Sequence, residues 1–247
     1  MIRIIPVILV KDGRVYQSLS FRNLVYLGDP QNTLAIFSEL PVDELIILSL
    51  DGILSDQDLA IFSNNTFIPL GYGGGVQTLE DAKRVFAHGY EKIVIRSGEL
   101  CSPLGIRQLS SIYGNSSISV KFDYRWDQQS LVVHQNGKNS RCTIETFLKT
   151  ITDFVEAGAG EIILTNMDRV GTWKGADWDF GQLCQSKISI PLIINGGIGS
   201  VTEIIAALEN SDLGGIGISS FFSFAAKDQG VLIHVPSKLE RILEQRR

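Results

Sequence analysis

The chain of 247 residues predicts one (β/α)8 barrel, and three observations support that fold class. Eight apolar, strand-like runs alternate strictly with eight helical patterns. The strand-like runs are continuously apolar, which is typical of parallel strands buried on both faces. A block that leads from a strand through glycines into a helix occurs twice, which predicts half-barrels at about 1–114 and 115–247. A doubly wound open sheet is the alternative, but it would not explain why the two halves match.

The expected strands are short aliphatic runs, and the expected helices follow them. Strands are predicted at 2–10, 45–50, 66–71, 92–96, 117–123, 161–166, 190–195 and 214–218. Helices are predicted at 30–39, 55–63, 78–88, 103–113, 145–157, 178–186, 200–209 and 237–246. Three connections after strands are long, namely 11–29, 124–144 and 167–177. In a barrel these connections lie at the C-terminal face, so we expect a functional site there.

The repeated block carries the clearest functional signal. Ile68-Pro69-Leu70-Gly71 leads into three glycines, and Ile190-Pro191-Leu192-Ile193 leads into Asn195 and two glycines. Glycines after a strand let backbone N–H groups approach an anion, and the N-terminus of the next helix favours negative charge. Two copies on opposite sides of one barrel predict a ligand with a phosphate group at each end. The expected phosphate-binding residues are Gly73, Gly74, Gly75, Arg96, Ser97, Gly171, Gly196, Gly197, Ser219 and Ser220. The alternative is that these glycines only form tight turns.

Composition excludes several classes of function. The net charge of −5 argues against a nucleic-acid or anionic-membrane partner. No apolar run approaches the length of a membrane span and no signal peptide is visible, so a cytoplasmic protein is expected. The three cysteines and three histidines are scattered without the spacing of metal ligands, so we expect neither a metal site nor a cofactor.

Charged residues open several of the expected strands. Arg3, Glu44, Lys92 and Glu161 stand at the beginnings of the first, second, fourth and sixth strands. In a barrel these positions share the N-terminal face, so two cations and two anions could close a ring over it. The alternative is four solvated end residues with little effect on stability.

Motifs along the whole chain resemble one known family. These motifs are Val10-Lys11-Asp12-Gly13-Arg14-Val15, Gly28-Asp29-Pro30, Asp43-Glu44-Leu45, Gly73-Gly74-Gly75 and Leu164-Thr165-Asn166-Met167-Asp168-Arg169. They are similar to the cyclase subunit of imidazole glycerol phosphate synthase (HisF). The resemblance implies a barrel of two half-barrels that pairs with a glutaminase subunit. It also implies that ammonia passes through the barrel to a bisphosphorylated ribonucleotide in histidine synthesis.

The chain departs from the family pattern at the expected catalytic pocket. The resemblance implies two catalytic aspartates, of which Asp123 on the fifth strand is present. The partner position on the first strand holds Leu9, and leucine cannot transfer a proton. Three further positions differ, at Gln17, Ser49 and Val170. Whether the barrel site turns over any substrate is therefore left open.

A second branch of the family is more similar to this chain. The ending 230–237 resembles barrel proteins encoded with surface-polysaccharide genes and associated with glycosyl amidation. This resemblance implies a glutaminase partner and a separate sugar amidotransferase, which forms an acetamidino group on a nucleotide sugar. The alternatives are the histidine cyclase itself, a non-catalytic phosphate-binding scaffold and a barrel isomerase that acts alone.

The resemblance also gives the N-terminal ring a function. The family uses such a ring as a gate for ammonia, and Arg3, Glu44, Lys92 and Glu161 match its positions. Asp43 and Glu91 then correspond to residues that dock the glutaminase. The chain supplies no glutaminase nucleophile of its own, because its cysteines lack a nearby base or elbow motif.

Overall fold

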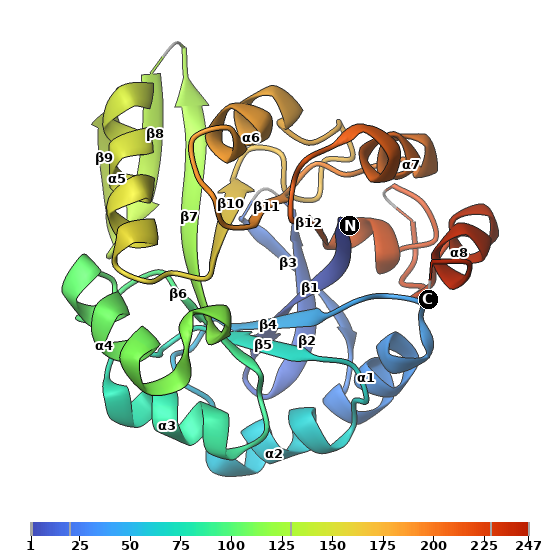
Figure 1. Ribbon diagram of the computed structural model, residues 1–247. Helices are drawn as coiled ribbons and strands as arrows, with labels where there is room; N and C mark the ends of the chain where they lie inside the picture. The colour runs from blue at the N-terminus through green and yellow to red at the C-terminus, as the bar shows by residue number, and fades with distance from the viewer. Residues whose placement is uncertain (1, 20, 129, 228, 247) are drawn as a thin grey trace.

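Eight parallel strands close into a barrel in the computed structural model, which describes residues 2–19, 21–128, 130–227 and 229–246 (Figure 1). Around the barrel they are β1 (Arg3–Lys11), β4 (Leu45–Ser49), β5 (Leu70–Gly73), β6 (Lys92–Ile95), β7 (Ile118–Asp127), β10 (Glu161–Asn166), β11 (Leu192–Asn195) and β12 (Gly215–Ile218). Pairing of β10 with β7 completes the circle. The predicted (β/α)8 fold class is confirmed.

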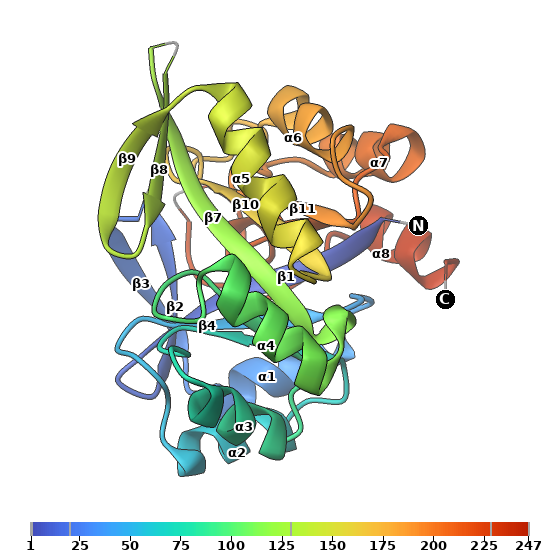
Figure 2. The same ribbon diagram turned by 60° about the vertical axis from the view of Figure 1, so that its left-hand side comes forward.

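Eight α-helices surround the barrel in the described part of the chain (Figures 1 and 2). They are α1 (Pro30–Glu39), α2 (Asp56–Asn64), α3 (Leu79–Ala87), α4 (Pro103–Tyr113), α5 (Ile144–Glu156), α6 (Trp178–Gln185), α7 (Val201–Asn210) and α8 (Ser237–Glu244). Short 3-10 turns lie at η1 (Asn115–Ser117) and η2 (Ser220–Phe222). Helices α1 and α4 begin at the predicted residues because Asp29 and Ser102 accept a first-turn backbone N–H and a proline follows each cap.

Two of the three long connections form antiparallel hairpins rather than irregular loops. The first contains β2 (Arg14–Leu19) and β3 (Asn23–Gly28), which extend the sheet from β1. In the second, β7 runs on to Asp127 and pairs with β8 (Ser130–Gln135), which pairs with β9 (Lys138–Cys142). Figure 2 shows both hairpins projecting on the same side of the barrel. Strand β5 begins at Leu70, later than the predicted residue 66.

Side chains inside the barrel form an apolar layer separate from the barrel–helix core. This layer is built by Ile5, Val7, Ile46, Val94, Ile163 and Ile193, with Leu48 packed against it. Strand glycines permit its close packing, since a Cβ on Gly73 would lie 2.8 Å from a Leu48 methyl group. The interior is therefore a packed core between the two ends of the barrel.

No helix among the described residues has the length and apolarity needed to cross a membrane.

Candidate functional site

A pocket of about 260 Å³ opens at the C-terminal ends of the barrel strands. Its walls come from β1, β4, β6, β7, β10 and β11 and from the β2–β3 and β7–β8 hairpins. The polar and charged residues that line it are Gln17, Ser18, Ser49, Arg96, Lys121, Asp123, His134, Thr165, Asn195 and Ser219. Active sites of this fold lie at this face, so the pocket is the candidate site.

Asp123 lies at the pocket between two cations. It is 2% exposed, and its Oδ1 accepts a hydrogen bond from the Lys121 ammonium group two residues before it on β7. The Arg96 Nε atom lies 3.6 Å from Asp123 Oδ2. Desolvation lowers the pKa of Lys121 and nearby Arg96 adds to this, whereas Asp123 raises it, and the balance is a lowered pKa. Two cations facing one carboxylate give this wall a net positive charge.

The four departures from the family pattern meet at this pocket. Leu9, Gln17, Ser49 and Val170 all line it. Gln17 is fixed in place, because its Nε2 donates a hydrogen bond of 2.8 Å to the Val7 carbonyl oxygen. The pocket surface at Leu9 is thus apolar where the resemblance implies a carboxylate.

Two other carboxylates near the first strand do not replace the missing one. Asp12 and Asp51 are both exposed, and neither lines the pocket. Asp51 Oδ2 instead accepts a 2.7 Å hydrogen bond from the Asp12 backbone N–H. Asp123 is therefore the carboxylate that the described chain brings to the pocket wall.

The expected phosphate-binding residues of the first half only partly face the pocket. Gly74 and Arg96 line it, whereas Gly73, Gly75 and Ser97 do not. Gly74 has a φ of 100°, and a Cβ there would lie 2.1 Å from the Ser49 carbonyl oxygen, so this turn requires glycine.

The expected phosphate-binding residues of the second half are more enclosed. Ser219 lines the pocket, but Gly196, Gly197 and Ser220 are buried outside its lining. Ser220 Oγ accepts a 2.9 Å hydrogen bond from Trp173 Nε1. Gly171 is also buried, and a Cβ there would lie 2.6 Å from the Ser18 carbonyl oxygen. The two halves therefore present different surfaces to a ligand.

A carboxylate occupies backbone donors before the helix that follows each turn. Asp81 Oδ2 accepts hydrogen bonds from the Gln77 and Thr78 backbone N–H groups, at 3.1 and 2.9 Å. Glu203 accepts hydrogen bonds from the Gly199 and Ala176 backbone N–H groups, at 3.2 and 2.7 Å, and from Trp178 Nε1 at 2.9 Å. Backbone donors before α3 and before α7 are therefore both occupied by a carboxylate. The Arg96 guanidinium group adds a positive charge beside Gly74, so an added anion is favoured more there than at the second turn.

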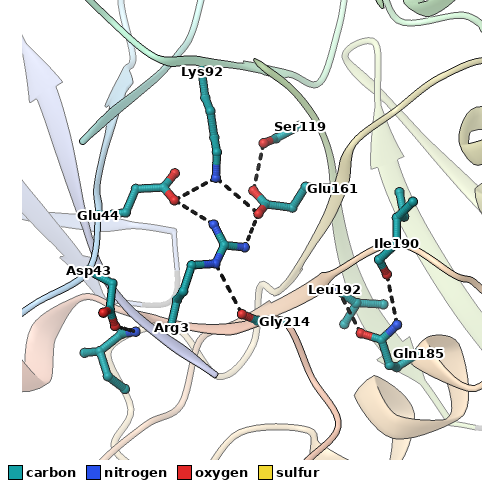
Figure 3. Close-up of polar contacts among 11 residues, drawn as sticks. Arg3, Asp43, Glu44, Lys92, Ser119, Glu161, Gln185, Ile190, Leu192 and Gly214 are labelled. Carbon is teal, nitrogen blue, oxygen red and sulfur yellow. Dashed lines mark hydrogen bonds and ion pairs between the residues drawn. The ribbon is translucent and has the colours of Figure 1, made fainter. Parts of the chain in front are cut away.

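At the opposite end of the barrel, the four charged residues at the strand beginnings make one network (Figure 3). Glu44 Oε2 accepts hydrogen bonds of 2.7 Å from both Arg3 Nη1 and Lys92 Nζ. Glu161 Oε2 pairs with Arg3 Nη2 and lies 3.4 Å from Lys92 Nζ, and its Oε1 accepts a 2.8 Å hydrogen bond from Ser119. We call Arg3, Glu44, Lys92 and Glu161 the charged ring.

The carboxylates of the charged ring are more buried than the sequence suggested. Glu44 and Glu161 are each 3% exposed, so only the two cations are partly exposed. Burial is the largest influence on Glu44 and raises its pKa, although Lys92 and Arg3 act in the opposite direction. The expectation of solvated end residues is therefore wrong for the two glutamates.

Asp43 and Glu91 lie beside the charged ring and are exposed. Asp43 Oδ2 accepts a 2.7 Å hydrogen bond from the Ile4 backbone N–H, and Glu91 Oε2 accepts one of 2.6 Å from Leu70 (Figure 3 shows the first). Each carboxylate thus links the beginning of its own strand to a neighbouring strand. Their exposure leaves this face accessible to another protein.

Two functional features were missed from the sequence. Lys121 was passed over although it shares the inward-facing side of β7 with Asp123, as alternating strand residues must. Asp177 was placed in the long connection 167–177 without a role of its own, yet its Oδ2 accepts hydrogen bonds from Tyr124 Oη, Trp126 Nε1 and Asn166 Nδ2 at 2.8–3.1 Å. This carboxylate fixes the loop 167–177 to β7 and β10.

Within the described residues, no three of the histidine, cysteine, aspartate and glutamate side chains are grouped to hold a metal ion. The charged groups of the pocket suit an anionic organic ligand better than a cation, because Arg96 and Lys121 outnumber Asp123.

Comparisons with known proteins agree with the architecture. The family of histidine biosynthesis proteins matches residues 3–225. A Pseudomonas aeruginosa protein, provisionally named imidazole glycerol phosphate synthase subunit hisF2, is 34% identical over 242 residues, covering 95% of each chain. The chain belongs to the HisF family. A provisionally named HisF protein of Leptospira interrogans is 32% identical over 248 residues, covering 97% of this chain and 96% of the relative. The imidazole glycerol phosphate synthase subunit HisF of Leuconostoc mesenteroides is 29% identical and covers 94% of this chain and 98% of its own.

Proposed function

We propose that this HisF-family barrel delivers ammonia from a glutaminase subunit to a second, acceptor-bearing enzyme in a glutamine-dependent amidation. The observation that carries the proposal is the difference between the two barrel ends. The charged ring is complete at the N-terminal face, whereas the pocket at the C-terminal face has Leu9 opposite Asp123. A barrel with a complete charged ring at its N-terminal face and an altered pocket at its C-terminal face suits the transfer of ammonia better than a reaction that consumes it.

The route begins at the charged ring. Arg3 and Lys92 bridge the two buried glutamates, and both cations have long side chains that can swing away from the axis. Asp43 and Glu91 lie exposed beside the charged ring, and in this proposal they are docking residues for a HisH-like glutaminase. The free cysteines Cys101, Cys142 and Cys184 fit a reducing compartment, so we place the complex in the cytoplasm.

The apolar layer forms the middle of the route. Ile5, Ile46, Val94 and Ile163 each follow a ring residue by two positions on the same strand. Ammonia is small and neutral, so it passes an apolar layer without the desolvation penalty of an ion. Thermal motion of these side chains would have to open the path, because they are well packed.

The pocket argues against ordinary cyclase chemistry. The family resemblance implies two carboxylates that exchange protons with the substrate, but Leu9 stands in place of one of them and has no proton to exchange. The phosphate-binding role of Gly74 and Arg96 does not need the lost carboxylate. We therefore propose that a phosphorylated small molecule binds this wall.

We further propose that the final acceptor is a nucleotide sugar of surface-polysaccharide synthesis, whose acetamido group becomes an acetamidino group. The resemblance of residues 230–237 to the glycosyl-amidation branch supports this acceptor. The second candidate is the histidine cyclase, which the presence of Asp123 in the pocket favours. A scaffold that binds phosphate without passing ammonia is the third.

Parallel assays separate these functions. The purified chain is combined with a HisH-like glutaminase and tested with the bisphosphorylated ribonucleotide of histidine synthesis. It is tested in parallel with a nucleotide-sugar amidotransferase and its acetamido sugar. We expect glutamine-dependent product only in the second assay. Product in the first assay would establish the cyclase instead, and no barrel-dependent product in either would support the scaffold.

A further inference from the structure

Lys121 is a buried cation at a position where ammonia delivery needs none. Strands β1, β4, β6 and β10 place an isoleucine or valine two residues after their ring residue. On β7, Ser119 contacts the charged ring, and Lys121 occupies the position two residues further on. Its register partner on β10 is Ile163 of the apolar layer. An aliphatic residue would fill this layer without the cost of burying a charge.

The surroundings of Lys121 form a reaction site rather than a simple core contact. Lys121 is 5% exposed but lines the pocket. Its Nζ lies 5.8 Å from the centre of the Phe21 ring, and Leu48 and Val94 line the same pocket. Asp123 accepts a hydrogen bond from Nζ and is therefore within reach to take its proton.

Two physical effects favour a reactive amine at this position. Desolvation disfavours the ammonium form, and Arg96 adds a second positive charge on the same wall. A lysine that is desolvated beside another cation gains the neutral, nucleophilic form. The negative charge of Asp123 opposes these two effects, because it favours the ammonium form of Lys121. The same carboxylate supplies the base that the reaction requires.

We propose that Lys121 is a nucleophile that forms an imine with the carbonyl group of a phosphorylated aldehyde or ketone. Asp123 takes one proton from the Nζ ammonium group, and the neutral nitrogen forms a bond to the carbonyl carbon as the second carbon–oxygen bond breaks. A proton passes from the nitrogen to the oxygen and gives a hydroxyl group. Asp123 returns its proton to this hydroxyl group, which leaves as water while a carbon–nitrogen double bond forms. One water is released, and no oxidant or reductant is needed.

The phosphate requirement follows from the same wall. Arg96 presents a guanidinium group, and the Gly74 turn presents backbone in the pocket. Both can hold a phosphate group while the carbonyl carbon reaches Lys121. The proposal concerns the chain alone, so it stands whether or not ammonia passes through the barrel.

Borohydride trapping tests the proposal on the isolated protein. The chain is incubated at neutral pH with glycolaldehyde phosphate or with glycolaldehyde, reduced with sodium borohydride, digested and mapped by mass spectrometry. Desolvation disfavours the ammonium form of Lys121, and Arg96 and the Gly74 turn can hold the phosphate group nearby. We therefore expect the phosphorylated probe to label Lys121 faster than the exposed Lys83 and Lys149. Label confined to exposed lysines would overturn the proposal.

Two variants and one competitor sharpen the result. Lys121→Arg keeps a cation beside Asp123 but cannot form an imine, so adduct at this position should disappear. Phe21→Ala exposes Nζ to water, which weakens the desolvation that favours the neutral amine, so labelling of Lys121 should slow while that of Lys83 stays unchanged. Inorganic phosphate should slow labelling of Lys121 by the phosphorylated probe only. If Lys121→Arg does not fold, the peptide map of the wild-type protein still shows whether the label lies on Lys121 or on the exposed lysines. Equal labelling by the two probes would refute the phosphate requirement.

Discussion

The two ends of the barrel hold similar numbers of charged groups in very different arrangements. At the N-terminal end, two glutamates and two cations compensate one another across four strands (Figure 3). At the C-terminal end, Lys121 and Arg96 face the single carboxylate of Asp123, and Leu9 stands across the pocket. The first arrangement is balanced and can act as a gate. The second is net positive and lacks the second carboxylate that the family resemblance implies, so it suits an anionic ligand.

The largest expected effect concerns cyclase activity at the C-terminal end. With ammonium salts, the protein should convert the histidine-pathway ribonucleotide about 10²–10⁴-fold more slowly than a HisF relative, because one member of the acid–base pair is absent. Leu9→Asp alone should not restore the rate, since Gln17 and the Lys121–Asp123 pair remain. Product formation is followed by chromatography, and a rate equal to that of the relative would contradict our description of this pocket.

Anion binding should distinguish the two halves of the pocket. Sulfate or phosphate in crystals should occupy the wall of Gly74 and Arg96 before that of Ser219, because Arg96 adds a positive charge to the first wall. Arg96→Ala should weaken phosphate binding by about 1.5–3 kcal/mol, measured by calorimetry. Ser219→Ala is the matched control with a smaller loss. Equal losses would remove the asymmetry that we infer between the halves.

The ring should contribute to stability as well as to function. Glu161→Ala removes a partner of Arg3 and Lys92 and leaves Ser119 without its acceptor. We expect the free energy of unfolding to fall by about 1–3 kcal/mol, since the cations remain partly solvated. Lys149→Ala, which removes an exposed pair with Asp153, should change it by about 0.5 kcal/mol or less. Urea unfolding compares the two, and similar small changes would show that the ring is energetically neutral.

The smallest expected effect is a dependence of stability on pH. Burial raises the pKa of Glu44 above its ordinary 4.5, so the folded protein binds this proton more tightly than the unfolded chain. The contribution of this bound proton to the free energy of unfolding is complete below pH 4.5 and is lost as the pH rises through the folded pKa of Glu44. As the pH rises through the folded pKa of Glu44, the free energy of unfolding of the wild-type protein should therefore fall relative to that of Glu44→Gln. A difference that stays constant or grows with pH would contradict the raised pKa.

The barrel was readable from the sequence because its strands are continuously apolar and its glycine block repeats. The ring was also readable, since four charged residues open strands of the same barrel. The β8–β9 hairpin was missed although Asn136 and Gly137 form its turn with φ of 51° and 72°, a typical two-residue signal. The aliphatic run of β8 is short, Leu131 to Val133, and β9 has no aliphatic residue, so the search for longer aliphatic runs missed both strands.

Side-chain pairing within the pocket was harder to predict than its location. Asp123 and Lys121 were visible as neighbours on a strand, but their contact depends on how much room the barrel interior leaves. The occupation of the second turn by Glu203 depends on how loop 167–177 folds against α7. Such contacts follow from tertiary packing and have no local sequence signal.

The most direct test of ammonia delivery is the ratio of glutamine-driven to ammonia-driven amidation in the complex with the glutaminase and acceptor enzyme. Lys92→Ala opens the charged ring without touching the pocket, and Lys83→Ala changes an exposed lysine on α3 as the control. Ammonium salts supply ammonia at the acceptor from solution, so this activity should be unaffected. The ratio should change for Lys92→Ala and stay constant for Lys83→Ala. An unchanged ratio in a fully assembled Lys92→Ala complex would mean that ammonia takes another route.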